Sequence, residues 1–395
     1  MGKIVLMALV ALLLPAVGRA GALTGTVRWN GTVRIAETVR VEPGAELIVA
    51  PGTRVEFSAG RLEVAGRLVA EEAEFGGDWE GILLKGSDQT TVLRNCRISG
   101  AKTGIMAVGG APLLEGLQLS GNDIGMELRQ KCAARVSGCR FEGNRKVGLF
   151  IKDEAAPEVE ENLFRNNGKF GTYIFRAVPA AFRQNRFAEN DTGLMIANFG
   201  SDPLVEANHF EGNRLGILVD RAARPKLTGN LLTGNATGIR LYRRSDPEVA
   251  GNRLIRNRVA ISVAYSSYPL LHGNDFSDNT TALLLEFQSA LWEAEKGSAA
   301  RAAEVAGRGA FGQAPRAQVS EEQRRASGAD GTVDARDNWW GAAGTAELQR
   351  IGSAGNPSFI QDGRDTPTFA EGGKYYPLDQ VRFAPWRSAP ATEQP

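Results

Sequence analysis

Residues 96–287 repeat one pattern of apolar and polar positions. In each unit from residue 162 on, an Asn stands two residues before an apolar residue, a second Asn follows five residues after the first, and a small residue then precedes an alternating apolar stretch such as residues 194–196. Successive first Asn residues are 22 or 23 residues apart. The first Asn column comprises Asn162, Asn185, Asn208, Asn230, Asn252 and Asn274, and the second comprises Asn144, Asn167, Asn190, Asn213, Asn235, Asn257 and Asn279.

This period predicts the fold. Helical repeats are about 33 residues or longer and carry a 3.6-residue apolar period, whereas each unit here holds short stretches of period two separated by Gly, Asn and Pro. A 22-residue unit with three short strands matches one coil of a parallel β-helix, in which equivalent side chains of neighbouring coils stack about 4.8 Å apart. We therefore predict an all-β, single-stranded parallel β-helix, a solenoid of about a dozen coils.

The Asn columns are expected to be structural. In the units upstream of Asn162 the first position is occupied by Cys96, Leu117 and Cys139, and such apolar substitutes indicate that the position points inward. A stacked, inward Asn can satisfy its amide by bonding to the Asn residues above and below it and to the backbone of the turn. We therefore expect buried Asn side chains with satisfied amides, without a catalytic role.

The flanking segments complete the domain organisation. Pro-Gly turns at residues 43–44 and 51–52 and alternation over residues 61–70 predict further coils and a cap over residues 23–95. Residues 288–330 form an Ala-, Arg- and Glu-rich insert, of which residues 290–306 are expected to be helical and the rest a mobile loop. Strand-like sequence returns at residues 332–341, and residues 331–395 are assigned to a C-terminal cap and tail, because solenoid ends must block edge pairing.

The first 22 residues have the features of an export signal. Lys3 supplies a positive charge, residues 4–14 are an apolar stretch too short to cross a membrane, and small residues follow at Gly18, Ala20 and Ala22. We expect cleavage after Ala20 or Ala22 and favour Ala22. No later segment is long and apolar enough to cross a bilayer, so we expect a periplasmic or extracellular protein.

Charge and composition exclude several functions. The chain has 46 Lys and Arg against 45 Asp and Glu, and loss of the predicted signal changes the formal net charge from +1 to −1. No basic field is present that would attract nucleic acid. Only two His and three Cys occur, which leaves little material for a metal centre or a His-dependent catalytic centre, and an odd number of Cys is no disulfide framework.

Short motifs mark the two ends of the repeat. Asp-Trp-Glu-Gly-Ile at residues 78–82 enters the coils, Asp-Asn-Trp-Trp-Gly at residues 337–341 closes them, and Val-Arg-Phe-Ala-Pro-Trp at residues 381–386 resembles a last strand. With the Asn-Phe/Leu coils, these features resemble the exported right-handed parallel β-helix proteins built on the carbohydrate-binding and sugar-hydrolase (CASH) repeat, a group that includes the copper-associated periplasmic NosD proteins. The resemblance implies right-handed coils over the mature chain. It does not select a function, because this fold hosts lyases, hydrolases, epimerases, adhesins and scaffolds.

The motifs of polysaccharide-cleaving β-helix enzymes are missing from the sequence. Polygalacturonase-like members carry Asn-Thr-Asp, Asp-Asp and Gly-His-Gly, and none of these occurs here. Epimerase-like members carry Asp-Pro-His, whereas neither Asp-Pro of the repeat, at Asp202 and Asp246, is followed by His.

One weak catalytic candidate remains. Asp202, Arg224 and Asp246 each precede the Pro of three successive coils, which would place the two carboxylates about 10 Å apart, near the upper end for an inverting glycosidase pair. An alternating-charge ladder along a turn explains the same arrangement. We interpret these residues as a ladder and keep catalysis as the alternative.

Metal and cofactor binding is not predicted. His209 and His272 belong to different columns about three coils apart, and the Met and Cys residues do not cluster as a soft-metal site requires. Cys96 and Cys139 share a column two coils apart, beyond the disulfide reach of about 7 Å. Cys132 and Cys139 can approach each other around a turn, which leaves their pairing open.

One outward column is unusually apolar. In the strand after each small residue the first and third positions point inward, so the middle position faces solvent. This column comprises Phe150, Tyr173, Met195, Leu218, Arg240 and Ser262, and the turn beyond it adds Phe175, Arg176, Arg221, Tyr242, Arg243 and Tyr265. We call these residues the outer stripe. Four successive apolar residues are more than a water-facing sheet normally shows.

The composition of the outer stripe suits a ligand. Aromatic faces stack on sugar rings, and Arg side chains suit carboxylates or phosphates. Burial of the stripe under the 288–330 insert or a second copy of the chain is the alternative. We therefore favour a non-catalytic exported protein that binds a polysaccharide or an envelope protein along its surface. A polysaccharide-active enzyme of the lyase, hydrolase or epimerase type is the runner-up, and a NosD-like copper-associated role is favoured least.

Overall fold

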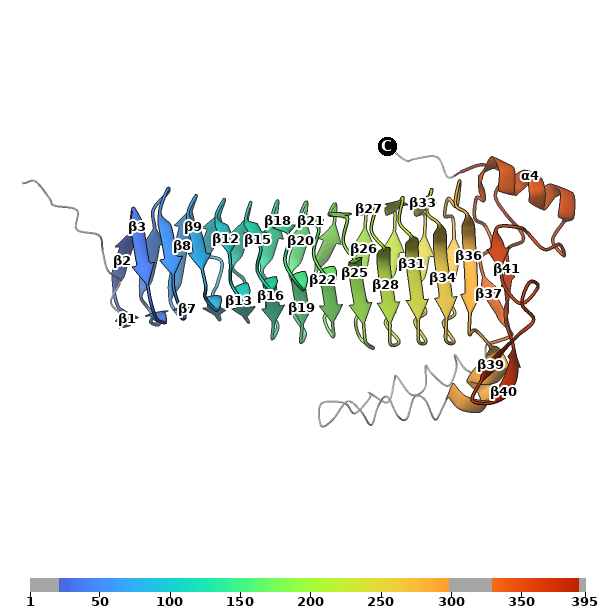
Figure 1. The fold of residues 1–395 in the computed structure, drawn as a ribbon, viewed down its shortest axis with the longest axis horizontal. Coiled ribbons are helices and arrows are strands. Elements are labelled where there is room, and N and C mark those ends of the chain that lie inside the picture. Colours follow the sequence, from blue (N-terminus) through green and yellow to red (C-terminus); the bar gives the residue numbers. More distant parts are fainter. Residues whose placement is uncertain (1–20, 298–328, 391–395) are drawn as a thin grey trace, which may run out of the picture.

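The chain winds into a solenoid of parallel strands (Figure 1). The computed structural model describes residues 21–297 and 329–390. Each regular coil contributes one strand to each of three sheets, which hold 14, 14 and 11 strands. The prediction of an all-β parallel β-helix of about 12 coils is confirmed. No helix in the described ranges is long and apolar enough to span a membrane.

The first sheet has the longest strands. Its members, in the order in which they pair, are β1 (Gly21–Leu23), β4 (Val39–Val41), β7 (Arg61–Val64), β10 (Gly81–Lys85), β13 (Thr103–Val108), β16 (Ile124–Arg129), β19 (Val147–Lys152), β22 (Phe170–Phe175), β25 (Thr192–Ala197), β28 (Leu215–Asp220), β31 (Thr237–Tyr242), β34 (Val259–Ala264), β36 (Thr281–Glu286) and β38 (Ile360–Gln361).

The second sheet follows the first in every coil. Its members are β2 (Thr26–Trp29), β5 (Glu46–Val49), β8 (Arg67–Glu71), β11 (Val92–Arg94), β14 (Leu113–Glu115), β17 (Arg135–Ser137), β20 (Glu158–Glu160), β23 (Ala181–Arg183), β26 (Leu204–Glu206), β29 (Lys226–Thr228), β32 (Glu248–Ala250), β35 (Leu270–His272), β37 (Thr332–Asp334) and β41 (Gln380–Arg382).

The third sheet completes each coil. Its members are β3 (Thr32–Ile35), β6 (Arg54–Phe57), β9 (Glu74–Gly77), β12 (Arg97–Ser99), β15 (Gln118–Ser120), β18 (Arg140–Glu142), β21 (Leu163–Arg165), β24 (Arg186–Ala188), β27 (His209–Glu211), β30 (Leu231–Thr233) and β33 (Arg253–Ile255). Because all three sheets are parallel and in register, side chains at equivalent positions stack in straight columns.

The two Asn columns form hydrogen-bonded ladders inside the turns. Asn208 is 1% exposed, and its Oδ1 accepts from the backbone N–H and the side-chain amide of Asn185, both at 3.0 Å. Its own amide donates to Asn230 Oδ1 at 3.1 Å and to the Phe182 carbonyl at 3.1 Å. Asn338, which follows the insert, accepts from Asn274 in the same way and extends the first ladder into the cap.

Stacked aromatic rings fill the core beside these ladders. Phe141, Phe164, Phe187 and Phe210 stack in one column with ring centroids 4.6–4.8 Å apart. Their planes are within 11° of parallel, so each coil repeats the packing of the previous one. Because each coil repeats this packing, the side chains on the outer face also recur at a constant spacing from coil to coil.

The C-terminal end is closed by elements that interrupt the repeat. A short helix α1 (Ala290–Trp292) runs into the π-helix η1 (Glu293–Gly297) beside the hairpin of β39 (Thr368–Glu371) and β40 (Lys374–Pro377). The helix expected over residues 290–306 is therefore observed as far as residue 297, and the remainder, with the expected loop, lies outside the described residues.

The cap also contains a helix that the sequence does not signal. Helix α4 (Gly341–Ile351) follows the Trp-Trp-Gly motif, and its N-cap, Trp340, makes no side-chain capping bond. The Trp340 ring instead stacks on Phe276 at 5.0 Å and covers the end of the aromatic core. The expected cap over residues 331–395 thus combines strands with a docked helix as far as residue 390.

The start of the solenoid bears on the export signal. Residues 1–20 lie outside the described residues, so the signal peptide stays a prediction. β1 pairs residue by residue with β4, from Gly21 opposite Val39 to Leu23 opposite Val41. Cleavage after Ala20 would keep this strand whole, whereas cleavage after Ala22 would remove two of its three residues.

Candidate functional site

The outer stripe runs across the outward face of the first sheet. The strand register places Phe150 beside Tyr173, and the same column continues without a gap to Arg240 and Ser262. None of the six side chains in this column is fully exposed to solvent: five are half-buried, and Ser262 is 3% exposed. Neighbouring rows shield the column, because bulky side chains such as Phe170 lie against it.

Aromatic rings gather at the N-terminal half of the outer stripe. Phe150 and Tyr173 stack with centroids 4.9 Å apart and planes 7° apart. Tyr173 also contacts Phe170 at 5.3 Å and Phe175 at 5.9 Å. Lys152 Nζ lies 5.1 Å from the centre of the Phe150 ring, in the position of a cation–π contact. The result is a half-buried aromatic platform with a cation at its border.

The C-terminal half repeats this combination of rings and cations. Tyr242 lies between two guanidinium groups, with Arg240 Cζ at 5.2 Å and Arg243 Cζ at 4.9 Å from its ring centre. Tyr265 meets Tyr242 at 5.0 Å and stacks on Phe287 at 5.2 Å. The three coils of Tyr242, Tyr265 and Phe287 therefore carry one aromatic residue each at or just beyond the end of the first-sheet strand.

The row continues onto the C-terminal cap. Phe287 contacts Phe369 of β39 at 5.6 Å, and Phe369 contacts Tyr376 of β40 at 6.0 Å. Tyr375, on the same hairpin, is 73% exposed. The hairpin thus extends the aromatic surface past the last regular coil.

Two basic residues of the stripe lie near a buried carboxylate and differ in how they pair with it. Asp220 is 3% exposed, and both of its oxygens accept from the Arg243 guanidinium, Nε at 2.7 Å. Arg221 lies 3.9 Å from the same carboxylate but stays 51% exposed. Arg243 is therefore committed to a buried ion pair, whereas Arg221 keeps a largely open guanidinium.

Two further carboxylates balance cations on this face. Glu286 Oε2 lies 3.8 Å from Arg240 and accepts from Ser262 Oγ at 2.9 Å, while Arg240 stays 42% exposed. At the other end, Glu127 is shared by Arg129 at 3.5 Å and Lys152 at 3.1 Å. Two cations thus share one acid there.

Burial raises the pKa of two phenols of the stripe, Tyr173 and Tyr265. It raises the pKa of Tyr173 above its usual value, an effect that nearby Arg221 opposes and Asp220 reinforces. The pKa of Tyr265 is also raised, first by burial and then by the neighbouring Tyr242. Both hydroxyls therefore remain protonated at neutral pH and can donate to an oxygen-rich ligand.

The two carboxylates of the predicted charge ladder, Asp202 and Asp246, bond to backbone N–H groups of turns. Asp202 Oδ1 accepts from the backbone N–H of Arg224 at 2.7 Å, and Asp246 Oδ1 accepts from that of Tyr268 at 2.7 Å. Each carboxylate thus ties its turn to the same turn of the next coil. This bonding explains Asp at both positions without catalysis.

Copper ligands do not come together in the described structure. His272 Nε2 lies 3.4 Å from Glu248 on the second sheet, whereas His209 lies on the third sheet, where burial lowers its pKa. Within residues 21–297 and 329–390, no group of three or more His, Cys, Asp or Glu side chains is placed to hold a metal ion. The described residues therefore do not fit a copper centre of these ligands.

All three cysteines are free and buried, including Cys132 and Cys139. Burial raises the pKa of Cys96 and Cys132 to about 11 and that of Cys139 to about 12. Since the thiolate is the reactive form, we expect no labelling of the native protein by iodoacetamide at pH 8 and labelling of three thiols after unfolding in urea. Mass spectrometry counts the adducts, and a native adduct or a disulfide-linked peptide would contradict this description.

The roles of several residues on this face are not predicted by the sequence analysis. Asp220 and Glu286 occupy the same column as Tyr242. Periodicity alone gives no sign that Asp220 holds a guanidinium group of the next coil, or that Glu286 lies near one of an earlier coil. Phe287 falls where the repeat ends, and Phe369 lies beyond the insert. A charge search restricted to residues about one repeat apart would have paired Asp220 with Arg243.

Comparisons with known proteins agree with this architecture. The family model described as right handed beta helix region matches residues 80–214, and the model described as periplasmic copper-binding protein (NosD) matches residues 165–301. A search of the curated proteins gives no match.

Two solved structures are similar at low identity. The Dettilon tailspike protein (gp208) is 14% identical, with a TM-score of 0.49, and the match covers 66% of this chain and 62% of the tailspike chain. The A-module of the mannuronan C-5 epimerase AlgE4 from Azotobacter vinelandii is 12% identical, with a TM-score of 0.33, and the match covers 65% of this chain and 88% of that module. The family matches and the observed coils together identify the chain as a right-handed parallel β-helix protein.

Proposed function

We propose that this protein is exported and binds an anionic polysaccharide along the outer stripe. The observation that carries the proposal is the run of outward apolar and aromatic side chains on successive coils, with half-buried rings towards both ends and cations at its border. Tyr173 and Tyr242 contribute half-buried rings to this surface, and Arg221 and Arg240 keep about half of their side-chain surface open. A planar guanidinium matches the geometry of carboxylate and phosphate groups.

The geometry favours an extended ligand over a compact one. From Phe150 to Phe287 this surface spans seven successive coils, roughly 30 Å at the spacing between parallel strands. Five of these coils carry the rings described above, and the two between them carry Met195 and Leu218 at the outward position. All of these rings except Phe287 are half-buried, so their side chains lose little rotamer freedom on binding. A polymer with a regular repeat can use the same contact several times, and each contact need supply only a small free energy.

A cellular location follows from the same proposal. The predicted export signal and the resemblance to a family described as periplasmic favour the periplasm or the cell surface. Anionic polysaccharides of the cell envelope are accessible in both compartments. We do not extend the copper binding in that family's description to this chain, because its described His and Cys residues lie apart.

The test is a binding titration with polysaccharides of different charge. We expect the protein to bind alginate or polygalacturonate, to ignore neutral dextran, and to bind more weakly as salt increases. The double variant Tyr173→Ala/Arg240→Ala should raise the Kd at least tenfold, which corresponds to about 1.4 kcal/mol.

A matched control uses another face of the same solenoid. Leu163→Ala/Arg165→Ala removes an apolar residue and a cation from the outward face of the third sheet, and we expect it to leave the Kd unchanged. Equal affinity of the double variant and the wild type would remove the outer stripe as the binding surface. Release of reducing ends or unsaturated products, lost in Asp202→Asn, would instead support the enzymatic alternative.

A further inference from the structure

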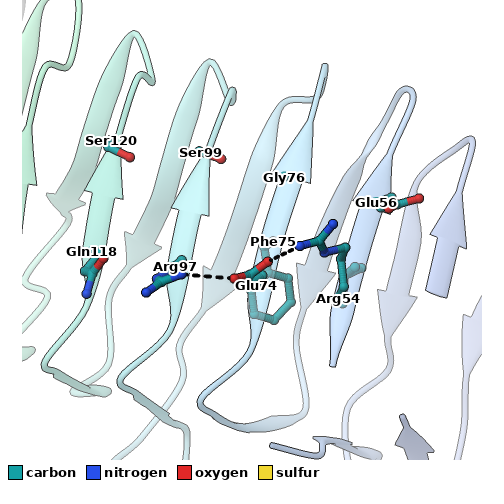
Figure 2. Close-up of a pocket in the computed structure, with 10 residues that line it drawn as sticks. Arg54, Glu56, Glu74, Phe75, Gly76, Arg97, Ser99, Gln118 and Ser120 are labelled. Atoms are coloured by element: carbon teal, nitrogen blue, oxygen red, sulfur yellow. Dashed lines mark hydrogen bonds and ion pairs between the residues drawn. The ribbon is translucent and has the colours of Figure 1, made fainter. Parts of the chain in front are cut away.

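A surface hollow lies on the outward face of the third sheet, near the N-terminal end of the solenoid. It has a volume of about 340 Å³ and spans strands β6, β9, β12 and β15 (Figure 2). It is lined by side chains of four neighbouring coils and belongs to a different sheet from the outer stripe. The polysaccharide-binding proposal above makes no use of it.

Charged side chains form one wall of the hollow. The strand register aligns Arg54, Glu74 and Arg97 in one outward row. Glu74 accepts from both guanidinium groups, from Arg54 at 3.0 Å and from Arg97 at 3.2 Å (Figure 2). Gln118 continues the row on β15. Because one carboxylate is shared by two Arg residues, both guanidinium groups keep N–H donors for another partner.

The opposite wall is made of a carboxylate and two hydroxyls. Glu56 stands beside Gly76 in the register, and Ser99 pairs with Ser120 on the next two strands. Glu56 also accepts from Arg34 at 3.1 Å, which holds its carboxylate in place. Both walls therefore present polar groups, with donors and acceptors on each side.

The hollow exists because Gly76 has no side chain. A Cβ placed on Gly76 would meet Ser99 Oγ at 3.4 Å, an ordinary contact, and its backbone is not in the left-handed region. Neither sterics nor conformation therefore demands glycine there. Elsewhere the same outward column carries larger residues such as Glu142 and Arg165, which would fill this space.

We propose that this hollow is a binding site for a neutral saccharide of one or two rings. The charges of Arg54 and Arg97 are balanced by those of Glu56 and Glu74, so the site does not select an anion. Paired donors and acceptors match hydroxyl groups, each of which donates and accepts. The hollow extends across four strands, about 14 Å at the spacing of parallel strands, and its volume is at the lower end for small-molecule sites.

The test fills the hollow without disturbing the fold. Gly76→Val adds a β-branched side chain, which suits a strand, and Thr233→Val places the same residue in the same column far from the hollow. We expect saturation-transfer NMR with cellobiose, maltose, lactose and methyl glucoside to show binding of at least one of them. The Kd should rise tenfold or more in Gly76→Val and stay unchanged in Thr233→Val.

Two further measurements separate this site from the outer stripe. Tyr173→Ala/Arg240→Ala should leave the saccharide Kd unchanged, and alginate should not compete for binding. Loss of affinity in Arg97→Gln, which keeps the hollow open, would add support. Absence of binding by all four saccharides to the wild-type protein, or an unchanged Kd in Gly76→Val, would overturn the proposal and leave the polysaccharide-binding proposal intact.

Discussion

Asn208→Ala is expected to lower the free energy of unfolding by about 3 kcal/mol, because it breaks the first Asn ladder in the middle of the solenoid. The side chain removed is 1% exposed, and its Oδ1 is the acceptor for two donors of Asn185. Its own amide satisfies the Phe182 carbonyl. All these groups stay buried in the variant, so the cost is that of orphaned polar groups in addition to a lost contact. Urea denaturation followed by circular dichroism measures it.

The control for this prediction is Leu204→Ala on the same coil. Leu204 is 50% exposed, so its removal should change the unfolding midpoint little, by about 0.5 kcal/mol or less. If Asn208→Ala unfolds at the wild-type midpoint, the Asn ladder does not stabilise the coils. Equal losses in the two variants would show that any truncation in this coil has the same effect.

Arg243→Ala is expected to cost about 2–3 kcal/mol of stability, even though Arg243 lies at the surface. It removes the guanidinium that holds both oxygens of the buried Asp220. Arg240→Ala provides the matched comparison, because its partner Glu286 is 35% exposed and lies 3.8 Å away. We expect this second loss to be under about 1 kcal/mol.

A second substitution tests whether stability is lost because a charge is left buried or because the turn is damaged in general. Asp220→Asn in the Arg243→Ala background removes the unpaired charge, so it should recover a large part of the lost stability. Similar unfolding midpoints for Arg240→Ala and Arg243→Ala would contradict the proposed difference between the two residues. This difference is the reason that the binding test uses Arg240 instead of Arg243.

The repeat makes much of this fold predictable from sequence. Each coil must stack on the next, so the Asn and Phe positions of residues such as Asn208 and Phe210 recur at the coil spacing and reveal strands, turns and inward positions. The same reasoning finds the aromatic positions of the outer stripe, because alternation assigns Tyr173 to the outward face.

Features that do not follow the repeat are harder to predict from the sequence. The pairing of Asp220 with Arg243 depends on side-chain directions in neighbouring turns, and outward positions tolerate almost any residue. Helix α4 has no capping residue, and packing of Trp340 on Phe276 holds it in place. The hollow at Gly76 arises from a missing side chain, and a single glycine in a chain with 47 glycines gives no signal.

The length dependence of binding tests the central claim most directly. Isothermal titration with a series of anionic oligosaccharides, such as oligogalacturonates of increasing length, compares an extended surface with a compact pocket. An extended surface predicts that affinity rises with length until the ligand spans the outer stripe, roughly 30 Å, and then levels off, with this gain lost in Tyr173→Ala/Arg240→Ala. The same affinity for the shortest and longest oligosaccharides, or a gain that survives in the double variant, would contradict binding along the outer stripe.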